Sequence, residues 1–385
     1  MAHHRTVFSQ LLQFVPRHEF EGLACEHHQG RKLRSISRWN QFVALATAQL
    51  TGRSSLRDIV SNLAAQSHKL YHLGAGIVSR SSLARVNEKQ PASLFEAVFA
   101  RLLSRCQTTA PSHPLRFKSK LYSLDSSMIE LTLELFPWAR YQATKGAMKL
   151  HLGLDHDGHL PAFVHVTEGG RHEIAWARSL DLPAGSMVVF DRGFLDYEWW
   201  KTLGNKGIRF VTRLKRNARY RVVESRVVTG KRNVTSDETI RFTRERTQAN
   251  DLVLRRIGYR DQETGKDFVF VTNDFKSAAT TIADVYRQRW QIELFFRWIK
   301  QNLKIKSFLG RSLNAVTTQI WVAMIVYLLL AYLKFQLRLT WSLSKILQLL
   351  QLNLFERRRL DELLRDPASP NPPPEDLQLR LAISS

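Results

Sequence analysis

The first third of the chain carries apolar residues at the spacing of amphipathic helices. Residues 37–50 place apolar side chains on one helical face, and Gly52 follows the last of them. Such a pattern predicts a helix that stops at a glycine. Further helices are predicted to begin at Ser55, Ser82 and Ser93. We therefore expect residues 1–115 to be all-helical.

From about residue 116 the apolar period changes from that of helices to that of strands. Strands are predicted over residues 120–125, 129–135, 149–154 and 161–167. The run Met-Val-Val-Phe before Asp191 is continuously apolar, as in a central strand buried on both faces. Short helices are predicted over residues 172–180 and 197–205. This order of elements predicts a mixed α/β domain.

Strands dominate again between residues 208 and 275, which predicts a β-rich insertion. Helix returns at Ala278 and continues to about residue 365. Its most apolar stretch, residues 320–333, is about 14 residues long, whereas a membrane span needs roughly 20. We therefore expect a buried core helix and no membrane association. Five of the twelve prolines fall in residues 367–374, so this tail is predicted to be disordered.

The net charge of the chain indicates what kind of partner it binds. The chain of 385 residues has 57 Lys and Arg against 34 Asp and Glu, a net charge of +23. This excess favours a polyanionic partner, nucleic acid first and an anionic membrane second, although a basic enzyme without such a partner is an alternative. Cys25 and Cys106 are too few for a disulfide framework or a cysteine zinc site, and the N-terminus has no apolar signal core. A reduced cytosolic setting fits.

The helical first part also carries basic residues. Arg80 just before the third predicted helix and Arg85 within it make this last helix basic, which suggests a helix-turn-helix reader of a DNA end. The alternative is a small helical bundle with a solvated basic face.

One later segment, residues 286–300, concentrates polar residues on one side of a predicted helix. On a single helix its polar members share an arc of about 80°. These members are Tyr286, Arg289, Glu293, Arg297 and Lys300. The other residues from Ile292 to Ile299 are apolar, so the helix is predicted to be largely buried. A buried carboxylate beside cations is costly unless it is paired or binds a metal. A structural Glu–Arg network is the alternative to a functional site.

Two aspartates accompany this glutamate. Asp125 ends one predicted strand and Asp191 ends another, so both could meet Glu293 at the rim of a sheet. Three carboxylates suit Mg²⁺ or Mn²⁺ and leave open positions for water and phosphate. Two such ions, about 4 Å apart, can activate a water or a 3′-hydroxyl and stabilise the leaving oxygen of a phosphodiester. The neighbouring cations would hold flanking phosphates. Of the other acids in this block, which include Glu173, Asp155 and Asp157 are predicted to shape a hairpin turn.

The spacing Tyr286-(2)-Arg289-(3)-Glu293-(6)-Lys300 matches the Y-(2)-R-(3)-E-(6)-K signature of bacterial DDE transposases of insertion-sequence family four. The segments Leu-Asp125-Ser and Phe-Asp191-Arg-Gly-Phe resemble that family's first and second aspartate regions. The resemblance covers roughly residues 1 to 340.

The resemblance implies an RNase H-like core in which Asp125, Asp191 and Glu293 are the catalytic residues and hold two Mg²⁺ ions, with Mn²⁺ as a substitute. It also implies cut-and-paste transposition of terminal inverted repeats into target DNA, inside a homodimer, in the cytoplasm at the nucleoid. DNA contacts are expected from the basic and aromatic residues of these segments. They are Tyr286, Arg289, Arg297, Lys300, Arg192, Arg80 and Arg85.

The expected organisation then has five parts. They are a helical DNA-binding domain (1–115), the first part of the RNase H-like core (116–207), an inserted β-rich domain (208–277), the helical second part of the core (278–345) and a C-terminal helix with a proline-rich tail (346–385).

One departure from the family concerns hairpin formation at the DNA end. Relatives stack a flipped base on a Trp of the insertion, but this chain has no Trp between Lys201 and Arg289. Tyr220, Phe242 or Tyr259 could take that role. Trp199 and Trp200 are expected to be core residues.

Two rival functions stay open. A metal-dependent nuclease would keep the three acids but would not join DNA ends, and a DNA-binding descendant of a transposase would not cleave at all.

Overall fold

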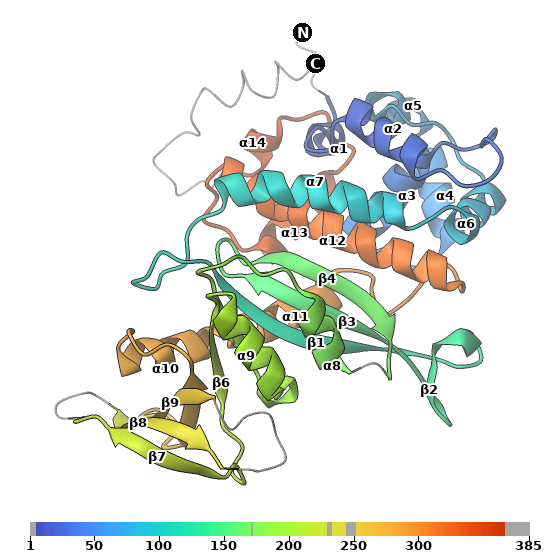
Figure 1. The fold of residues 1–385 in the computed structure, drawn as a ribbon. Coiled ribbons are helices and arrows are strands. Elements are labelled where there is room, and N and C mark those ends of the chain that lie inside the picture. Colours follow the sequence, from blue (N-terminus) through green and yellow to red (C-terminus); the bar gives the residue numbers. More distant parts are fainter. Residues whose placement is uncertain (1–4, 171, 229–232, 244–251, 366–385) are drawn as a thin grey trace. The chain divides into compact units, whose positions relative to one another are not determined.

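The computed structural model describes residues 5–170, 172–228, 233–243 and 252–365 of the chain, as a mixed α/β fold (Figure 1). The residues form two compact units. The helical unit comprises residues 1–111, 129–146 and 297–385, and the sheet unit comprises residues 112–128 and 147–296. The tail predicted to be disordered lies outside the described residues.

The helical unit contains most of the helices. They are α1 (Val7–Leu12), α2 (Arg17–Glu26), α3 (Arg38–Thr51), α4 (Leu56–Ala65), α5 (Ser67–Leu70), η1 (Tyr71–Leu73), α6 (Arg80–Lys89), α7 (Ser93–Thr109), η2 (Pro137–Ala139), α12 (Leu313–Gln336), α13 (Leu343–Asn353) and α14 (Leu360–Leu363). Helix α12 packs against α7, α3, α6 and α13, so segments from both ends of the chain share one core (Figure 1).

The predicted helices of the first third are present. Ser37 Oγ accepts a hydrogen bond from the backbone N–H of Asn40 at the start of α3, and the helix ends at Gly52, whose φ of +71° is left-handed. Ser55 caps α4 as predicted. The prediction for the third helix was wrong by two residues: α6 begins at Arg80 because Ser79, not Ser82, provides the cap. The short helices α1 and α2 were not predicted.

Helix α12 confirms the predicted core helix. Within the described residues it is the one helix whose length and composition would allow it to cross a membrane, and 89% of its most apolar stretch is buried. A membrane span would instead present apolar side chains to lipid. The prediction of a buried core helix therefore holds.

The strands form one sheet in the order β2-β3-β1-β5-β6-β10-β9-β8-β7, with β4 paired to β3. Their bounds are β1 (Leu121–Leu131), β2 (Arg140–Gln142), β3 (Lys145–Asp155), β4 (Leu160–Glu168), β5 (Met187–Phe190), β6 (Arg209–Arg213), β7 (Tyr220–Ser225), β8 (Val234–Phe242), β9 (Val253–Arg260) and β10 (Asp267–Thr272). Strand β5 pairs in parallel with β1 and β6, whereas β6 and β10 are antiparallel.

Two features differ from the expected strands. The two strands predicted over residues 120–125 and 129–135 are one strand, β1, because the backbone stays extended through the polar residues 125–127; this strand ends at Leu131, so residues 132–135 lie beyond it. The strands predicted as an inserted β-rich domain continue the same sheet, since β6 hydrogen-bonds to β5 on one side and to β10 on the other.

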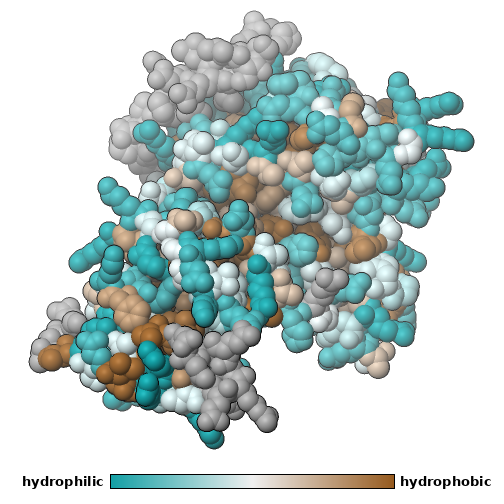
Figure 2. Space-filling view, viewed as in Figure 1, coloured by the Kyte–Doolittle hydropathy of each residue, from teal (hydrophilic) through white to brown (hydrophobic). Residues whose placement is uncertain are grey.

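The central strand β5 is buried on both faces, as predicted. Val188 and Phe190 pack with Trp200 beneath α9 (Tyr197–Asn205), beside α8 (Glu173–Ser179). Met187 and Val189 pack on the opposite face with residues of α10 (Ala279–Gln288). Layers of helix on both faces therefore fix the position of the residue that follows β5, which is Asp191. At the edge of the sheet, β7 exposes Val222 and Val223. Figure 2 shows hydrophobic (brown) surface at the lower left, where Figure 1 places the end of the sheet with β7 and β8.

Candidate active site

Parallel pairing brings the two predicted aspartates to the same edge of the sheet. In the register of β1 and β5, Leu124 lies opposite Phe190, and the next residue on each chain is Asp125 and Asp191. Carboxyl ends of adjacent parallel strands meet at one edge, which is where α/β folds place their ligands. The two carboxylates are therefore neighbours because of the strand pairing alone.

Local hydrogen bonds orient each aspartate. Asp125 Oδ1 accepts from the backbone N–H of Ser126 at 2.8 Å. Asp191 Oδ1 accepts from the backbone N–H of Gly193 at 2.7 Å, as the cap of the short helix η3 (Arg192–Phe194). The backbone carbonyl of Asp191 accepts from Thr212 Oγ1 at 3.2 Å, which ties the end of β5 to β6.

The glutamate lies on a helix that differs from the predicted one. Residues 286–300 do not form a single helix: α10 ends at Gln288 and α11 (Trp290–Asn302) begins two residues later. At this break the N–H of Arg289 bonds to the carbonyl of Tyr286, three residues back, which tightens the turn. Leu294, predicted to be buried, is 37% exposed. The single polar stripe is therefore interrupted at Arg289.

Arg289 connects the glutamate with the first aspartate. Its Nη2 donates to Glu293 Oε1 at 2.6 Å, and its Nη1 is 3.9 Å from Asp125 Oδ2. The side chain of Arg289 is 15% exposed, so this pairing takes place away from bulk water. The guanidinium therefore stands between two of the three predicted catalytic acids.

The acids influence one another's ionisation. Burial, together with the charges of Asp191 and Glu293, raises the pKa of Asp125 to about 7, although the hydrogen bond from the Ser126 N–H and the charge of Arg289 oppose the rise. Burial and the neighbouring acids disfavour the charged form of this carboxyl, so an additional positive charge beside it would favour that form. A divalent cation would supply that charge.

The donor set fits a hard divalent cation, because all three residues offer carboxylate oxygens. Within the part of the chain that the structure describes, no three His, Cys, Asp or Glu side chains are already grouped closely enough to hold one metal ion. Arg289 occupies the space between Asp125 and Glu293, so it has to withdraw before both can bind one ion.

A group of arginines beside Asp191 was not predicted as a group. Arg192 follows Asp191 directly. Its pKa is lowered by burial and, to a smaller extent, by the charges of Arg213 and Arg216. Arg213 stands at the end of β6, with its guanidinium 4.9 Å from the ring centre of Phe268. Tyr286 lies near this group and packs on Phe270. The signal that could have identified it is the position of both Arg192 and Arg213 at the ends of neighbouring strands.

The remaining predicted DNA contacts belong to the helical unit. Arg297 is exposed on α11, and Arg80 and Arg85 are exposed on α6. The pKa of Lys300 is lowered mainly by burial and, to a smaller extent, by the charge of Lys306. Nothing in the described contacts brings Arg80 or Arg85 to an acid, which suits residues that face a polyanion.

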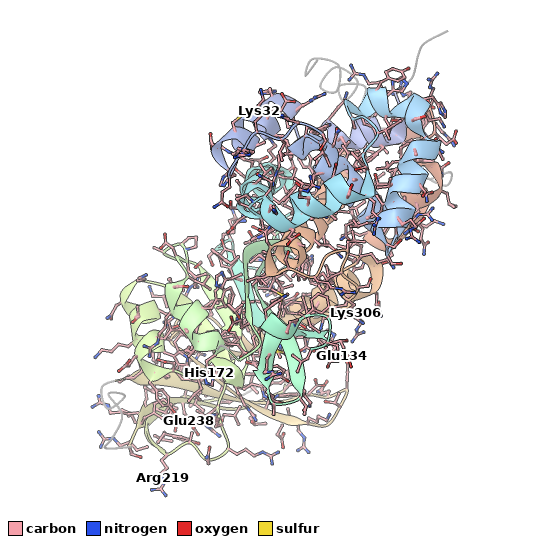
Figure 3. All side chains as sticks on the ribbon, turned by 90° about the vertical axis from the view of Figure 1, so that its right-hand side faces the viewer. Lys32, Glu134, His172, Arg219, Glu238 and Lys306 are labelled. Atoms are coloured by element: carbon pink, nitrogen blue, oxygen red, sulfur yellow. The ribbon has the colours of Figure 1, made fainter. Side chains whose placement is uncertain are left out.

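The aromatic residues that could stack a base differ in how far their side chains are buried. Phe242 and Tyr259 are buried in the cores on either face of the sheet. Tyr220 is half-buried, and the Arg256 guanidinium lies 5.5 Å from its ring centre. Arg219, the residue before it, points outward from the sheet in Figure 3. Trp199 and Trp200 are core residues, as expected.

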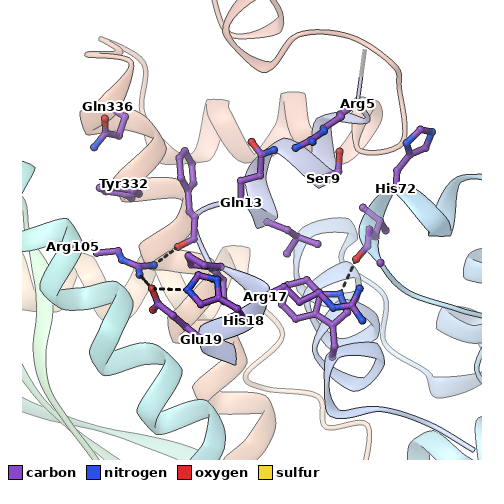
Figure 4. A pocket seen from close by; sticks show the side chains of 17 residues that line it. Arg5, Ser9, Gln13, Arg17, His18, Glu19, His72, Arg105, Tyr332 and Gln336 are labelled. Atoms are coloured by element: carbon purple, nitrogen blue, oxygen red, sulfur yellow. Dashed lines mark hydrogen bonds and ion pairs between the residues drawn. The ribbon is translucent and has the colours of Figure 1, made fainter. Parts of the chain in front are cut away.

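Two other features belong to structure rather than to a site. Asp155 and Asp157 form the predicted hairpin turn between β3 and β4, where both pair with Lys120. A hollow of about 930 Å³ in the helical unit is lined by Arg17, Glu19 and Arg105 among other residues, and it contains none of the three acids (Figure 4). Two of its charged residues pair with each other, since Arg105 Nη2 donates to Glu19 Oε1.

Comparison with known proteins gives a consistent family. Residues 116–329 match the family described as the transposase DDE domain, and residues 3–76 match a domain of unknown function. A protein named as a transposase, y4zB, from Sinorhizobium fredii is 32% identical over 74% of this chain and 80% of its own length. A protein named as a transposase for insertion sequence element IS5377, from Geobacillus stearothermophilus, is 31% identical over 66% of this chain and 67% of its own length.

A solved structure is also similar. The piggyBac transposase synaptic complex with hairpin DNA aligns over 98% of this chain and 85% of its own, with 10% sequence identity and a TM-score of 0.44. The family match covers more than half of the chain and includes the strands and the helix that carry Asp125, Asp191 and Glu293. The chain belongs to the DDE transposases of bacterial insertion sequences.

Proposed function

We propose that this transposase cuts the phosphodiester at the ends of its element and joins the released 3′-hydroxyl to target DNA, with Asp125, Asp191 and Glu293 as the catalytic residues. The observation that carries the proposal is the bridge of Arg289 between Asp125 and Glu293, next to Asp191. A guanidinium here neutralises two carboxylates in the absence of other cations.

The three acids would hold two Mg²⁺ ions, for which Mn²⁺ could substitute. When bound, these ions activate the attacking oxygen and stabilise the leaving oxygen of the phosphodiester. The protein's own contribution is to fix the backbone positions of the three acids on a sheet edge and a helix, so that only side chains, Arg289 among them, have to move when the ions bind.

Arg289 has a second task in this proposal. Its release from Asp125 and Glu293 frees a fully charged, planar donor that can bind a phosphate with two hydrogen bonds. Together with Arg192, Tyr286 and Lys300 it would hold the backbone on either side of the scissile bond. Arg297, Arg80 and Arg85 would extend the contact along the inverted repeat.

The RNase H-like character of the core, action as a homodimer on two DNA ends, and a place at the nucleoid in the cytoplasm complete the proposal. They are supported by the order of catalytic residues on parallel strands β1 and β5 and by the net charge of +23. Strand transfer distinguishes this function from that of a simple nuclease.

The test is an assay with end DNA in which both cleavage and joining are measured. Wild-type protein should nick the end and join pre-cleaved ends to a target plasmid with Mg²⁺. Glu293→Gln should bind the same DNA but lose both reactions, because it removes a charged ligand at almost constant shape. Glu198→Gln is the matched control, since Glu198 is an exposed glutamate that pairs with Arg178. Cleavage without joining would favour the nuclease, and cleavage by Glu293→Gln would refute the assignment of the site.

A further inference from the structure

A fourth acidic side chain lies beside the three proposed catalytic acids. Glu173 is the first residue of α8, and its side chain is 27% exposed. Its Oε1 accepts a hydrogen bond from Ser126 Oγ at 2.5 Å and is 3.5 Å from Lys149 Nζ. Ser126 is the residue whose backbone N–H binds Asp125. One oxygen of Glu173 is thus held by the neighbour of the first catalytic aspartate.

The other oxygen faces the second catalytic aspartate. A side chain added at Gly193 would place its Cβ 2.9 Å from Glu173 Oε2 and 2.9 Å from Asp191 Oδ1. The two carboxylate oxygens therefore flank the small space that the glycine leaves open. Glu173 thereby links the surroundings of Asp125 to those of Asp191.

Such an arrangement is unfavourable for a carboxylate that only anchors a helix. Its Oε1 is satisfied by Ser126 and Lys149, but Oε2 faces a second negative charge across Gly193. Like charges at close range raise the free energy of the folded state unless a cation lies between them. Lys149 Nζ lies 3.5 Å from Oε1, and a divalent ion between Oε2 and Asp191 Oδ1 would relieve the repulsion across Gly193.

We propose that Glu173 is a fourth acidic residue of the catalytic centre and binds, through Oε2, the divalent ion held by Asp191. This inference rests on the proposed function. Ser126 and Lys149 would fix the orientation of Glu173, and Gly193 would leave room for the ion between the two carboxylates. A larger residue at position 193 would fill that room.

The experiment measures Mn²⁺ binding to the full-length protein by electron paramagnetic resonance, without DNA and without turnover. Glu173→Gln is compared with wild type and with Glu198→Gln, which makes the same chemical change at an exposed ion pair of the same unit. We expect Glu173→Gln to raise the Kd for Mn²⁺ by about tenfold or more. Glu198→Gln should leave the Kd unchanged. An unchanged Kd in Glu173→Gln would overturn the proposal.

A second variant and a second measurement distinguish metal binding by Glu173 from a purely structural role. Ser126→Ala removes the hydrogen bond to Oε1 but keeps the carboxylate, so it should retain Mn²⁺ binding and lower the melting temperature. Without metal, Glu173→Gln should melt at or above the wild-type temperature, because it relieves the repulsion with Asp191. If Ser126→Ala and Glu173→Gln instead lose Mn²⁺ binding equally and both melt early, Glu173 only anchors α8 and the proposal fails.

Asp191→Asn distinguishes this failure from that of the proposed function. If Asp191→Asn loses Mn²⁺ binding and Glu173→Gln does not, only the role of Glu173 is refuted. If Asp191→Asn also binds Mn²⁺ as wild type does, the assignment of the whole metal site is wrong.

Discussion

Arg289 Nη2 donates to Glu293 Oε1 at 2.6 Å, across the three residues that separate them in the signature Tyr-(2)-Arg-(3)-Glu-(6)-Lys. The pair survives the break between α10 and α11, because the tightened turn at Arg289 keeps both side chains on the side that faces Asp125. The spacing of the signature therefore has a physical meaning: it joins the cation that we propose to bind DNA to the acid that we propose to be catalytic.

Replacement of Arg289 by Ala should weaken the binding of end DNA. We expect the slope of log K against log salt to become shallower by about one for the lost phosphate contact. Fluorescence anisotropy at several salt concentrations measures this slope. Arg287→Ala is the control, since Arg287 lies two residues away but is 64% exposed and pairs with Asp284. Lys300→Ala should behave like Arg289→Ala, and an unchanged slope in both would place these residues away from DNA.

The recognition of the inverted repeat can be tested at α6. Arg80 and Arg85 are exposed there, so their joint replacement by Ala should reduce the preference for the inverted repeat over unrelated DNA of equal length. Arg101→Ala on the exposed side of α7 is the control. Competition binding measures the preference, and an undiminished preference would move recognition to another part of the chain. Deletion of residues 1–115 is a poorer test, because α3 and α7 pack on α12.

The pH dependence of stability should depend on His156. This imidazole is 2% exposed and forms a 2.6 Å hydrogen bond with Ser123 on β1, and burial lowers its pKa to about 3. In the unfolded chain its pKa is about 6.5. The stability it provides is therefore complete above pH 6.5 and is lost as the pH falls toward 3.

Between pH 7.5 and pH 5 this single group should reduce the free energy of unfolding by about 2 kcal/mol. Urea unfolding of wild type and His156→Gln at both pH values measures the effect. The wild type should lose more stability than the variant over this interval. Equal losses in the two proteins would show that His156 does not titrate with a lowered pKa.

Much of the fold could be predicted from local patterns. The serine and glycine limits of α3, the exact span of α9 and the burial of β5 on both faces follow from caps and apolar period, which depend on near neighbours. Contacts between residues far apart in the sequence were harder to predict. The continuation of the sheet from β5 through β6 to β10 depends on backbone pairing, which the apolar pattern of a single strand does not specify.

The candidate site was also predicted only in part, because some of its features are local in the sequence and others depend on long-range contacts. Asp125 and Asp191 each follow an apolar run, Glu293 falls within a helical pattern, and the residues around them match a family signature. The break before α11 changes only the backbone hydrogen bond at Arg289. The spacing of polar and apolar residues continues across it, so that spacing could not indicate the break. The positions of Glu173 and Arg213 depend on neighbouring strands and loops, and no spacing in the sequence connects them with Asp191.

The convergence of the three acids on divalent ions is the central claim, and iron-directed cleavage of the protein tests it most directly. Fe²⁺ with ascorbate and peroxide cuts a polypeptide close to the site where the metal is bound. The full-length protein should be cut near Asp125, near Asp191 and near Glu293, with excess Mg²⁺ suppressing all three cuts and Asp191→Asn abolishing them. Cuts at only one of these segments, or cuts that persist with Mg²⁺, would contradict a shared metal site.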